Sequence, residues 1–464
     1  MKSNQKYLSI SFLIAYIFAN SNQLSLSLPD IEEYQLKNGM RILFSPNYEA
    51  PVVYFSMQIN VGTLDSPENM PELAQKVFYE LNNKTKKFSK KNQLKEKFYS
   101  LGNDYGNFNK FYMNLTTSRL DHICLKEDVK DCIEIFSEVL INPLLSFKNN
   151  PIEKLTMKYA PSSLFASKRL ATKLHAEYMF NGLISYFRPS TRMSYSKKDA
   201  MDWYSKYIKP ENITLMISGD INVLYLKKIL KEYFEQWEQS TSIIKSKEHS
   251  ININHNSGIK VQLTNMENVS KPIVRITKKT TDLNNFWDPA IQMALYIFYK
   301  DRLERIQLKM NNAVNIGWGW EQSNRMPFTY ITFESNYNLI NDFYLELLSE
   351  FNDVSNNTIT ENDLNKAVKT RTNNYQQKIY DPKTLNTMVL YYYNENGYSL
   401  EKVAQLVDDI QAVTLEDVNL AAKKVFDPNN FIMTVAGNKD SLTTFLNQFK
   451  NIEYYKQAEE IRHK

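Results

Sequence analysis

Histidine is the side chain most often used as a catalytic base or as a zinc ligand, and the 464-residue chain contains five histidines. None of them stands in an H-x-x-E-H or H-E-x-x-H arrangement, in which two imidazoles four residues apart bind zinc from one helix face. His175 and Glu177 are two residues apart on a predicted helix, so they point to different sides. The chain also has no P-loop, nucleophile elbow or dinucleotide fingerprint. The five histidines are His122, His175, His249, His255 and His463.

The element best suited to position a site lies between Val53 and Leu81. Apolar and polar residues alternate from Val53 to Val61, which predicts a strand with one face on a core. Gly62 and the Asp65-Ser66-Pro67 cluster end this strand. A helix is predicted next, because Leu73, Ala74, Val77, Phe78 and Leu81 form one apolar stripe, and Gln75 and Tyr79 flank it one turn apart.

This strand, loop and helix resemble the opening of the insulinase/pitrilysin family of zinc peptidases, which includes the mitochondrial processing peptidase. Val61-Gly62-Thr63 fits the start of the family pattern, and Leu73-Ala74 fits the residues before its first histidine. The inverted motif H-x-x-E-H then falls on Gln75, Phe78 and Tyr79. The resemblance therefore implies a peptidase frame that has lost two zinc ligands and the catalytic glutamate.

The other functional positions of the family are also changed. The third ligand, a glutamate, is expected on a later helix, but residues 154–176 contain no acidic residue and Glu177 comes too late. In the second half, Asp301-Arg302-Leu303 matches the start of an element whose arginine and tyrosine hold substrate. Those two positions fall on Leu308 and Asn315. We therefore predict no catalytic residue, no metal ligand and no zinc in this chain, with zinc expected only in an active partner.

The two halves of the chain repeat each other. Residues 414–438 match residues 196–220 without a gap at an offset of 218, so that Asp199 pairs with Asp417 and Gly219 with Gly437. An internal repeat of this length predicts two copies of one α+β domain. We expect domains at 28–239 and 258–459, joined by a polar linker at 240–257. In the first copy, Gly219 is expected in a turn and Asp220 as the cap of the next helix.

The resemblance gives this duplication a fold. It implies an α+β chain of two homologous domains, each a mostly antiparallel sheet packed against helices, which together form half of a metallopeptidase-like clamshell. It also implies that an edge strand between residues 105 and 125 can accept a peptide by β-addition. Alternatively, the aromatic residues of this segment serve packing within the sheet.

Composition and the first residues suggest where the chain acts. Lys2 and Lys6 precede an apolar run from Leu8 to Ala19, and small residues follow, so residues 1–21 are predicted to be an export signal. The chain is then periplasmic or secreted, or held at a membrane by an uncleaved signal. A net charge of +5 without a dense basic run argues against nucleic acid as a partner. Cys124 and Cys132 are predicted to be buried small hydrophobes, and a disulfide between them stays open.

Three functions remain open at this point. In the first, the chain is a helper subunit that pairs with an active zinc-peptidase homologue as a heterodimer and binds unfolded peptides. Alternatively it is a scaffold or peptide-binding protein without a peptidase partner. The third alternative is a divergent zinc metalloendopeptidase, which the missing ligands disfavour.

Overall fold

The structure is a computed structural model. It describes residues 28–67, 70, 73–90, 92–102, 110–114, 116–145, 196–238, 259–266, 269–279, 288–321, 328–395, 397–428 and 431–454. The predicted linker at 240–257 and the predicted signal at 1–21 lie outside these residues. Within the described helices, no helix is both long and apolar enough to cross a membrane.

The first half is one mixed sheet with helices on one face. In the described residues its strands run in the order β1-β2-β6-β3-β5-β4, with β2 and β6 parallel and the other pairs antiparallel. The strands are β1 Glu32–Gln35, β2 Arg41–Pro46, β3 Val52–Ile59, β4 Lys110–Met113, β5 Ser118–Leu125 and β6 Ile213–Gly219. The helices are α2 Leu73–Glu80, α3 Gln93–Ser100, α5 Val129–Ile141, α8 Lys197–Tyr207 and α9 Val223–Phe234.

The second half has a sheet of related order. Its described strands run β12-β7-β11-β8-β10-β9, with β7 parallel to β11 and to β12. The strands are β7 Lys260–Asn265, β8 Ile273–Lys279, β9 Asn315–Glu321, β10 Phe328–Glu334, β11 Ile432–Gly437 and β12 Ile452–Tyr454. The helices are α10 Pro289–Ile297, η4 Phe298–Arg302, α11 Leu303–Lys309, α12 Tyr337–Ser355, α13 Glu361–Tyr380, α14 Pro382–Val389, η5 Leu390–Glu395, α15 Leu400–Ala404, α16 Leu406–Gln411, α17 Leu415–Val425 and α18 Thr443–Leu446.

Five strands of each half share one order. Strands β2-β6-β3-β5-β4 of the first sheet correspond to β7-β11-β8-β10-β9 of the second. Helices α8 and α17 begin and end 218 residues apart, and each starts with a capping box, from Ser196 and Asp199 and from Thr414 and Asp417. This shared order supports the predicted duplication, and the domain boundaries at 28–239 and 258–459 stay predictions. The α+β class of the two sheets and their helices is as predicted.

The end of β6 shows why glycine is required at position 219 and corrects the prediction for Asp220. Gly219 has φ of +145°, and a Cβ there would lie 2.2 Å from the backbone oxygen of Val52, so only glycine fits. The predicted helix cap at Asp220 is wrong. The side chain of Asn222 caps α9 by accepting from two backbone N–H groups, whereas Asp220 pairs with Lys126 at 2.8 Å. Two capping-type residues so close together cannot be ranked from sequence.

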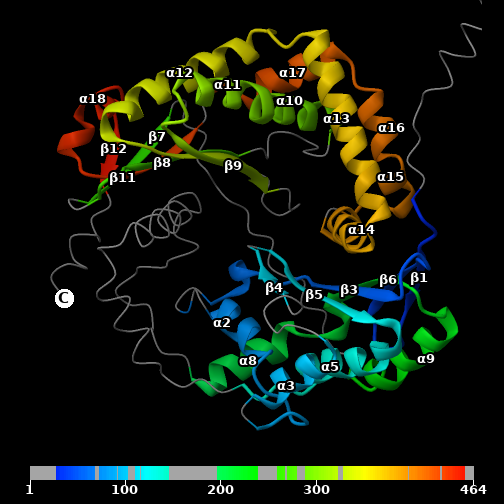
Figure 1. The fold of residues 1–464 in the computed structure, drawn as a ribbon. Helices are drawn as coiled ribbons and strands as arrows, with labels where there is room; N and C mark the ends of the chain where they lie inside the picture. Colours follow the sequence, from blue (N-terminus) through cyan, green and yellow to red (C-terminus); the bar gives the residue numbers. More distant parts are fainter. Residues whose placement is uncertain are drawn as a thin grey trace, which may run out of the picture.

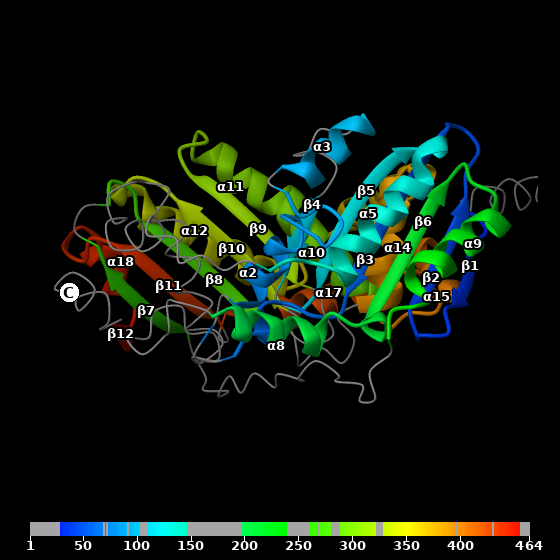
Figure 2. The ribbon, with the colours of Figure 1, turned by 90° about the horizontal axis from the view of Figure 1, so that it is seen from below.

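The sheets of the two halves face each other, with helices outside (Figure 1). Helices α10, α11, α12 and α17 cover the outer face of the second sheet, and α3, α5, α8 and α9 lie beyond the first sheet (Figures 1 and 2). The burial pattern agrees, because Phe55 of β3 and Ile276 of β8 belong to the two hydrophobic cores. Residues one position away, such as Ser56 and Arg275, therefore lie on the inner faces.

Helix α14 of the second half docks on the inner face of the first sheet, against β3 and β6. Asn386 is its fully buried contact residue. Its Nδ2 donates to the backbone oxygens of Tyr54 at 3.1 Å and Met216 at 3.3 Å, and its Oδ1 accepts a hydrogen bond from Ser218. Asn386 thus joins the two halves through three hydrogen bonds.

Candidate functional site

Helix α2 carries the three residues to which the resemblance assigns the inverted zinc motif. Phe78 lies on the apolar stripe and is 0% exposed, as the spacing predicts. Gln75 is half-buried and Tyr79 is 48% exposed. The helix therefore turns one apolar ring into the core, where the family places a carboxylate, and leaves an amide and a phenol at the edge.

These residues do not fit a zinc ion. A phenyl ring donates no electron pair to a metal, and zinc sites use Cys, His, Asp and Glu. Within the described residues, no group of three or more such side chains could hold a metal. The rings of Phe78 and Tyr79 lie 6.4 Å apart and pack against one another instead. The segment that would carry the third ligand, including Glu177, lies outside the described residues, as do His175, His249, His255 and His463.

His122 is the one histidine within the described residues, and it belongs to the first core. Its Nε2 lies 3.2 Å from the sulfur of Cys132, and its ring packs on Phe98 and Phe136. Cys124 and Cys132 are buried thiols, as predicted. A hydrogen bond to Cys124 and burial raise the pKa of Cys132, so this thiol is poorly suited to nucleophilic chemistry.

The second-half positions contribute no substrate-binding group either. Leu308 lies in the last turn of α11 and is 60% exposed. Asn315 is the first residue of β9. Lys309, one residue from the expected arginine position, pairs with Glu346 of α12 at 2.6 Å. That ion pair places Lys309 on the helical layer.

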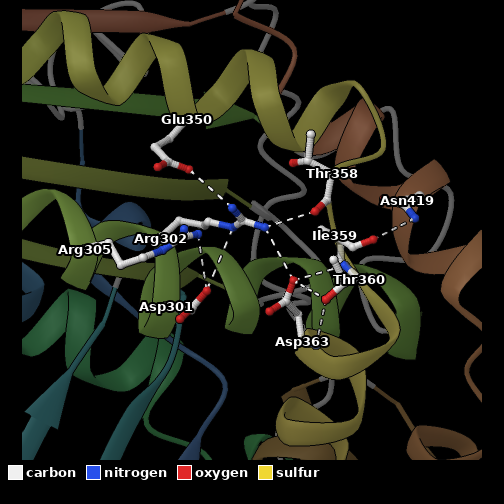
Figure 3. A network of polar contacts seen from close by, with 9 residues as sticks. All are labelled: Asp301, Arg302, Arg305, Glu350, Thr358, Ile359, Thr360, Asp363 and Asn419. Atoms are coloured by element: carbon white, nitrogen blue, oxygen red, sulfur yellow. Dashed lines mark hydrogen bonds and ion pairs between the residues drawn. The ribbon is translucent and has the colours of Figure 1, made fainter.

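Arg302, which the second-half element does retain, has a structural role (Figure 3). Its Nη2 donates to the backbone oxygen of Thr358 at 3.1 Å and to Asp363 at 3.5 Å, and Nη1 lies 3.9 Å from Glu350. The network joins η4, α12 and α13. Burial raises the pKa of Asp363, but the hydrogen bonds from Thr360 and the charge of Arg302 lower it on balance.

Charged side chains on the inner faces of the sheets form the remaining candidates. On the first sheet, Arg119 pairs with Asp121 at 3.0 Å and lies 4.9 Å from the Tyr112 ring centre. Burial raises the pKa of Asp121, even though Arg119 opposes the effect. On the second sheet, Arg275 lies over Tyr330. Arg275 was not among the residues expected to be functional, although a lone arginine within an apolar strand pattern is a usable signal.

The sequence is similar to zinc peptidases and to proteins related to them. Residues 194–371 match the family described as "Peptidase M16 inactive domain". A curated relative is a probable zinc protease, PqqL, from Haemophilus influenzae, which is 22% identical over 308 residues. That alignment covers 62% of this chain, and the chain spans about a third of the relative's length (32%).

Two solved structures show the same fold. The M16 inactive-domain protein of Pseudomonas fluorescens has a TM-score of 0.73 at 13% identity, over 88% of this chain and 98% of that one. The periplasmic protease PqqL of Escherichia coli has a TM-score of 0.66 at 15% identity. This second match covers 95% of this chain and 50% of that chain.

Proposed function

Because the chain is a degenerate member of the insulinase/pitrilysin (M16) peptidase family, we propose that it is a non-catalytic helper subunit that binds unfolded peptide. In this proposal it forms a heterodimer with an active zinc-peptidase homologue. The zinc belongs to that partner, and this chain holds no cofactor.

The observation that carries the proposal is the environment of α2. Phe78 is fully buried at the position of the family's catalytic base, and Gln75 and Tyr79 stand at the positions of its zinc-binding histidines. Activation of water by zinc needs three protein ligands and a nearby base. Without them, the role left to this half is to shape a binding surface.

Two features support peptide binding between the sheets. Strands β4 and β9 lie at the edges of their sheets, and among the described strands each is paired on one side. A free strand edge can accept an extended peptide through backbone hydrogen bonds, which do not depend on side-chain identity. In the E. coli structure the matched unit is half of the chain, which supports an assembly of two such units.

Export is also proposed, together with a place of action in the periplasm or outside the cell. Its support is the basic, apolar start of the sequence and the periplasmic assignment of E. coli PqqL.

The test uses a tagged chain purified from its native extract, with co-purifying chains identified by sequencing. We expect a partner with an intact H-x-x-E-H motif, and cleavage of denatured, alkylated casein by the complex but not by this chain alone. Cleavage by this chain alone refutes the proposal. Binding of casein peptides without any peptidase partner favours the scaffold alternative.

A further inference from the structure

Arg275 lies in the middle of the second sheet, on the face turned toward the first half. Its neighbours Val274 and Ile276 belong to the hydrophobic core beneath the helices, so the side chain of Arg275 projects to the opposite face. The residues directly across from it are Thr332 of β10 and Thr434 of β11. Both are uncharged, so the ladder itself offers the guanidinium no counter-ion.

Within the described residues, the guanidinium of Arg275 makes no hydrogen bond or ion pair, and it lies over an aromatic ring. Its Cζ lies 4.1 Å from the ring centre of Tyr330, and its Nε is buried without a hydrogen-bond partner. Burial lowers the pKa of Arg275, and the side chain as a whole is half-buried, so the desolvation of its charge is partial. Glu334, an acidic residue on the same face of β10, lies across from Ile273 and makes no ion pair with Arg275.

Arg275 differs in this respect from the other arginines that the structure describes. Arg302 is surrounded by the oxygens of Thr358, Asp363 and Glu350 (Figure 3). The remaining four also have oxygen partners. These pairs are Arg41 with Glu33, Arg119 with Asp121, Arg305 with Asp301, and Arg371 with Gln292 and Tyr375.

A charge that is partly removed from water and has no counter-ion is costly, and a binding role is a physical reason to keep one. A guanidinium binds a carboxylate through two parallel hydrogen bonds, and this pairing compensates for the hydration that the charge loses on burial. We propose that Arg275 is the anchor for a carboxylate of a peptide bound between the two sheets. The proposal rests on the peptide binding proposed above and adds the chemical class of the group that is recognised.

Tyr330 holds the anchor in place. A Cβ at Gly319 of β9 would lie 2.8 Å from the Tyr330 hydroxyl, so the tyrosine ring extends across a position that glycine leaves free. The guanidinium lies over the face of this ring, and this cation–π contact restrains the side chain. Lysine, a point charge on a flexible stem, would not reproduce this geometry.

The experiment measures the binding of three short N-acetylated peptides of one neutral, unstructured sequence by isothermal titration calorimetry on the full chain. The first ends in a free carboxylate, the second in an amide, and the third in an amide but with one internal glutamate. We expect the acid-bearing peptides to bind about tenfold more tightly than the neutral amide, because a hydrogen bond to a charged group is strong. Tighter binding of the first peptide indicates recognition of an α-carboxylate, and tighter binding of the third indicates recognition of a side-chain carboxylate.

Three variants complete the test. Arg275→Met should bind all three peptides with the affinity that the wild type has for the neutral amide, and its melting temperature should not fall, because an unpaired buried charge is removed. Arg275→Lys should keep part of the preference. Arg371→Met removes another tyrosine-stacked arginine, which has its own oxygen partners, and should leave the preference intact.

The outcomes separate the two proposals. Equal affinities for the three peptides in the wild type, or an unchanged preference in Arg275→Met, overturn the anchor and leave peptide binding standing. If no peptide binds, both proposals are wrong.

Discussion

Replacement of Phe78 by glutamate tests whether the position that the resemblance assigns to the catalytic base serves packing. Phe78 is 0% exposed within the first core. Phe78→Glu removes ring burial that stabilises the fold by about 1.5–3 kcal/mol. It also puts an acid where no described residue supplies a metal site.

The cost of the acid depends on pH in a defined direction. Burial raises the folded-state pKa of the new glutamate above its unfolded value of about 4.3, so the variant loses stability as pH rises above that value. Keeping the side chain neutral at pH 7 costs roughly 3.7 kcal/mol, and at pH 5 about 1 kcal/mol. Together with the lost ring, the expected destabilisation at pH 7 is about 5–7 kcal/mol, comparable to the stability of many domains.

Urea unfolding of the wild type and Phe78→Glu at pH 5 and pH 7 measures this difference. The matched control is Tyr79→Glu on the next, 48% exposed position, which should change stability by less than about 1 kcal/mol and show no such pH dependence. If Phe78→Glu is as stable at pH 7 as the control, the reasoning about packing is wrong.

The triple variant Gln75→His, Phe78→Glu, Tyr79→His should also be destabilised and inactive with added zinc. Peptide cleavage by this triple variant, with wild-type stability, would show that the rest of the site had survived.

Three further predictions concern the frame. Asn386→Ala should destabilise the chain by about 2 kcal/mol, because it leaves hydrogen-bonding groups at the junction of the halves unpaired. Thr387→Ala on the same helix should cost less, and urea unfolding and limited proteolysis measure both variants. Gly219→Ala should cost more than about 3 kcal/mol, since its Cβ would lie 2.2 Å from a backbone oxygen, but Gly102→Ala, with open space around it, should cost about 1 kcal/mol; equal melting temperatures would contradict this account. Asp363→Asn should cost about 1 kcal/mol at pH 7. Because the folded pKa of Asp363 is lowered, that difference should disappear as pH falls below about 3.9, and a pH-independent difference would refute the assignment.

Sequence patterns predicted part of the frame because those patterns are local. The alternation in β3 and the apolar stripe of α2 each reflect one element and its immediate surroundings. The position of Phe78 in the core follows from the stripe alone. The cap of α9 was missed because Asp220 and Asn222 are both good capping residues, and the choice depends on the path of the chain after Gly219.

The long-range side-chain contacts could not be predicted, because they join residues that are far apart in the chain. Asn386 reaches Tyr54 across 332 residues, and the network of Arg302 extends over 61. The absence of an oxygen partner for Arg275 among the described residues is a property of three neighbouring strands. No spacing within one segment carries such information.

The zinc content of the purified chain tests the central claim most directly. After equilibration with zinc and removal of loosely bound metal, mass spectrometric metal analysis should find well below one zinc per chain, with Gln75, Phe78 and Tyr79 at the motif positions. One tightly held zinc per chain, lost on substitution of Gln75 or Tyr79, would contradict the account of a non-catalytic peptidase homologue.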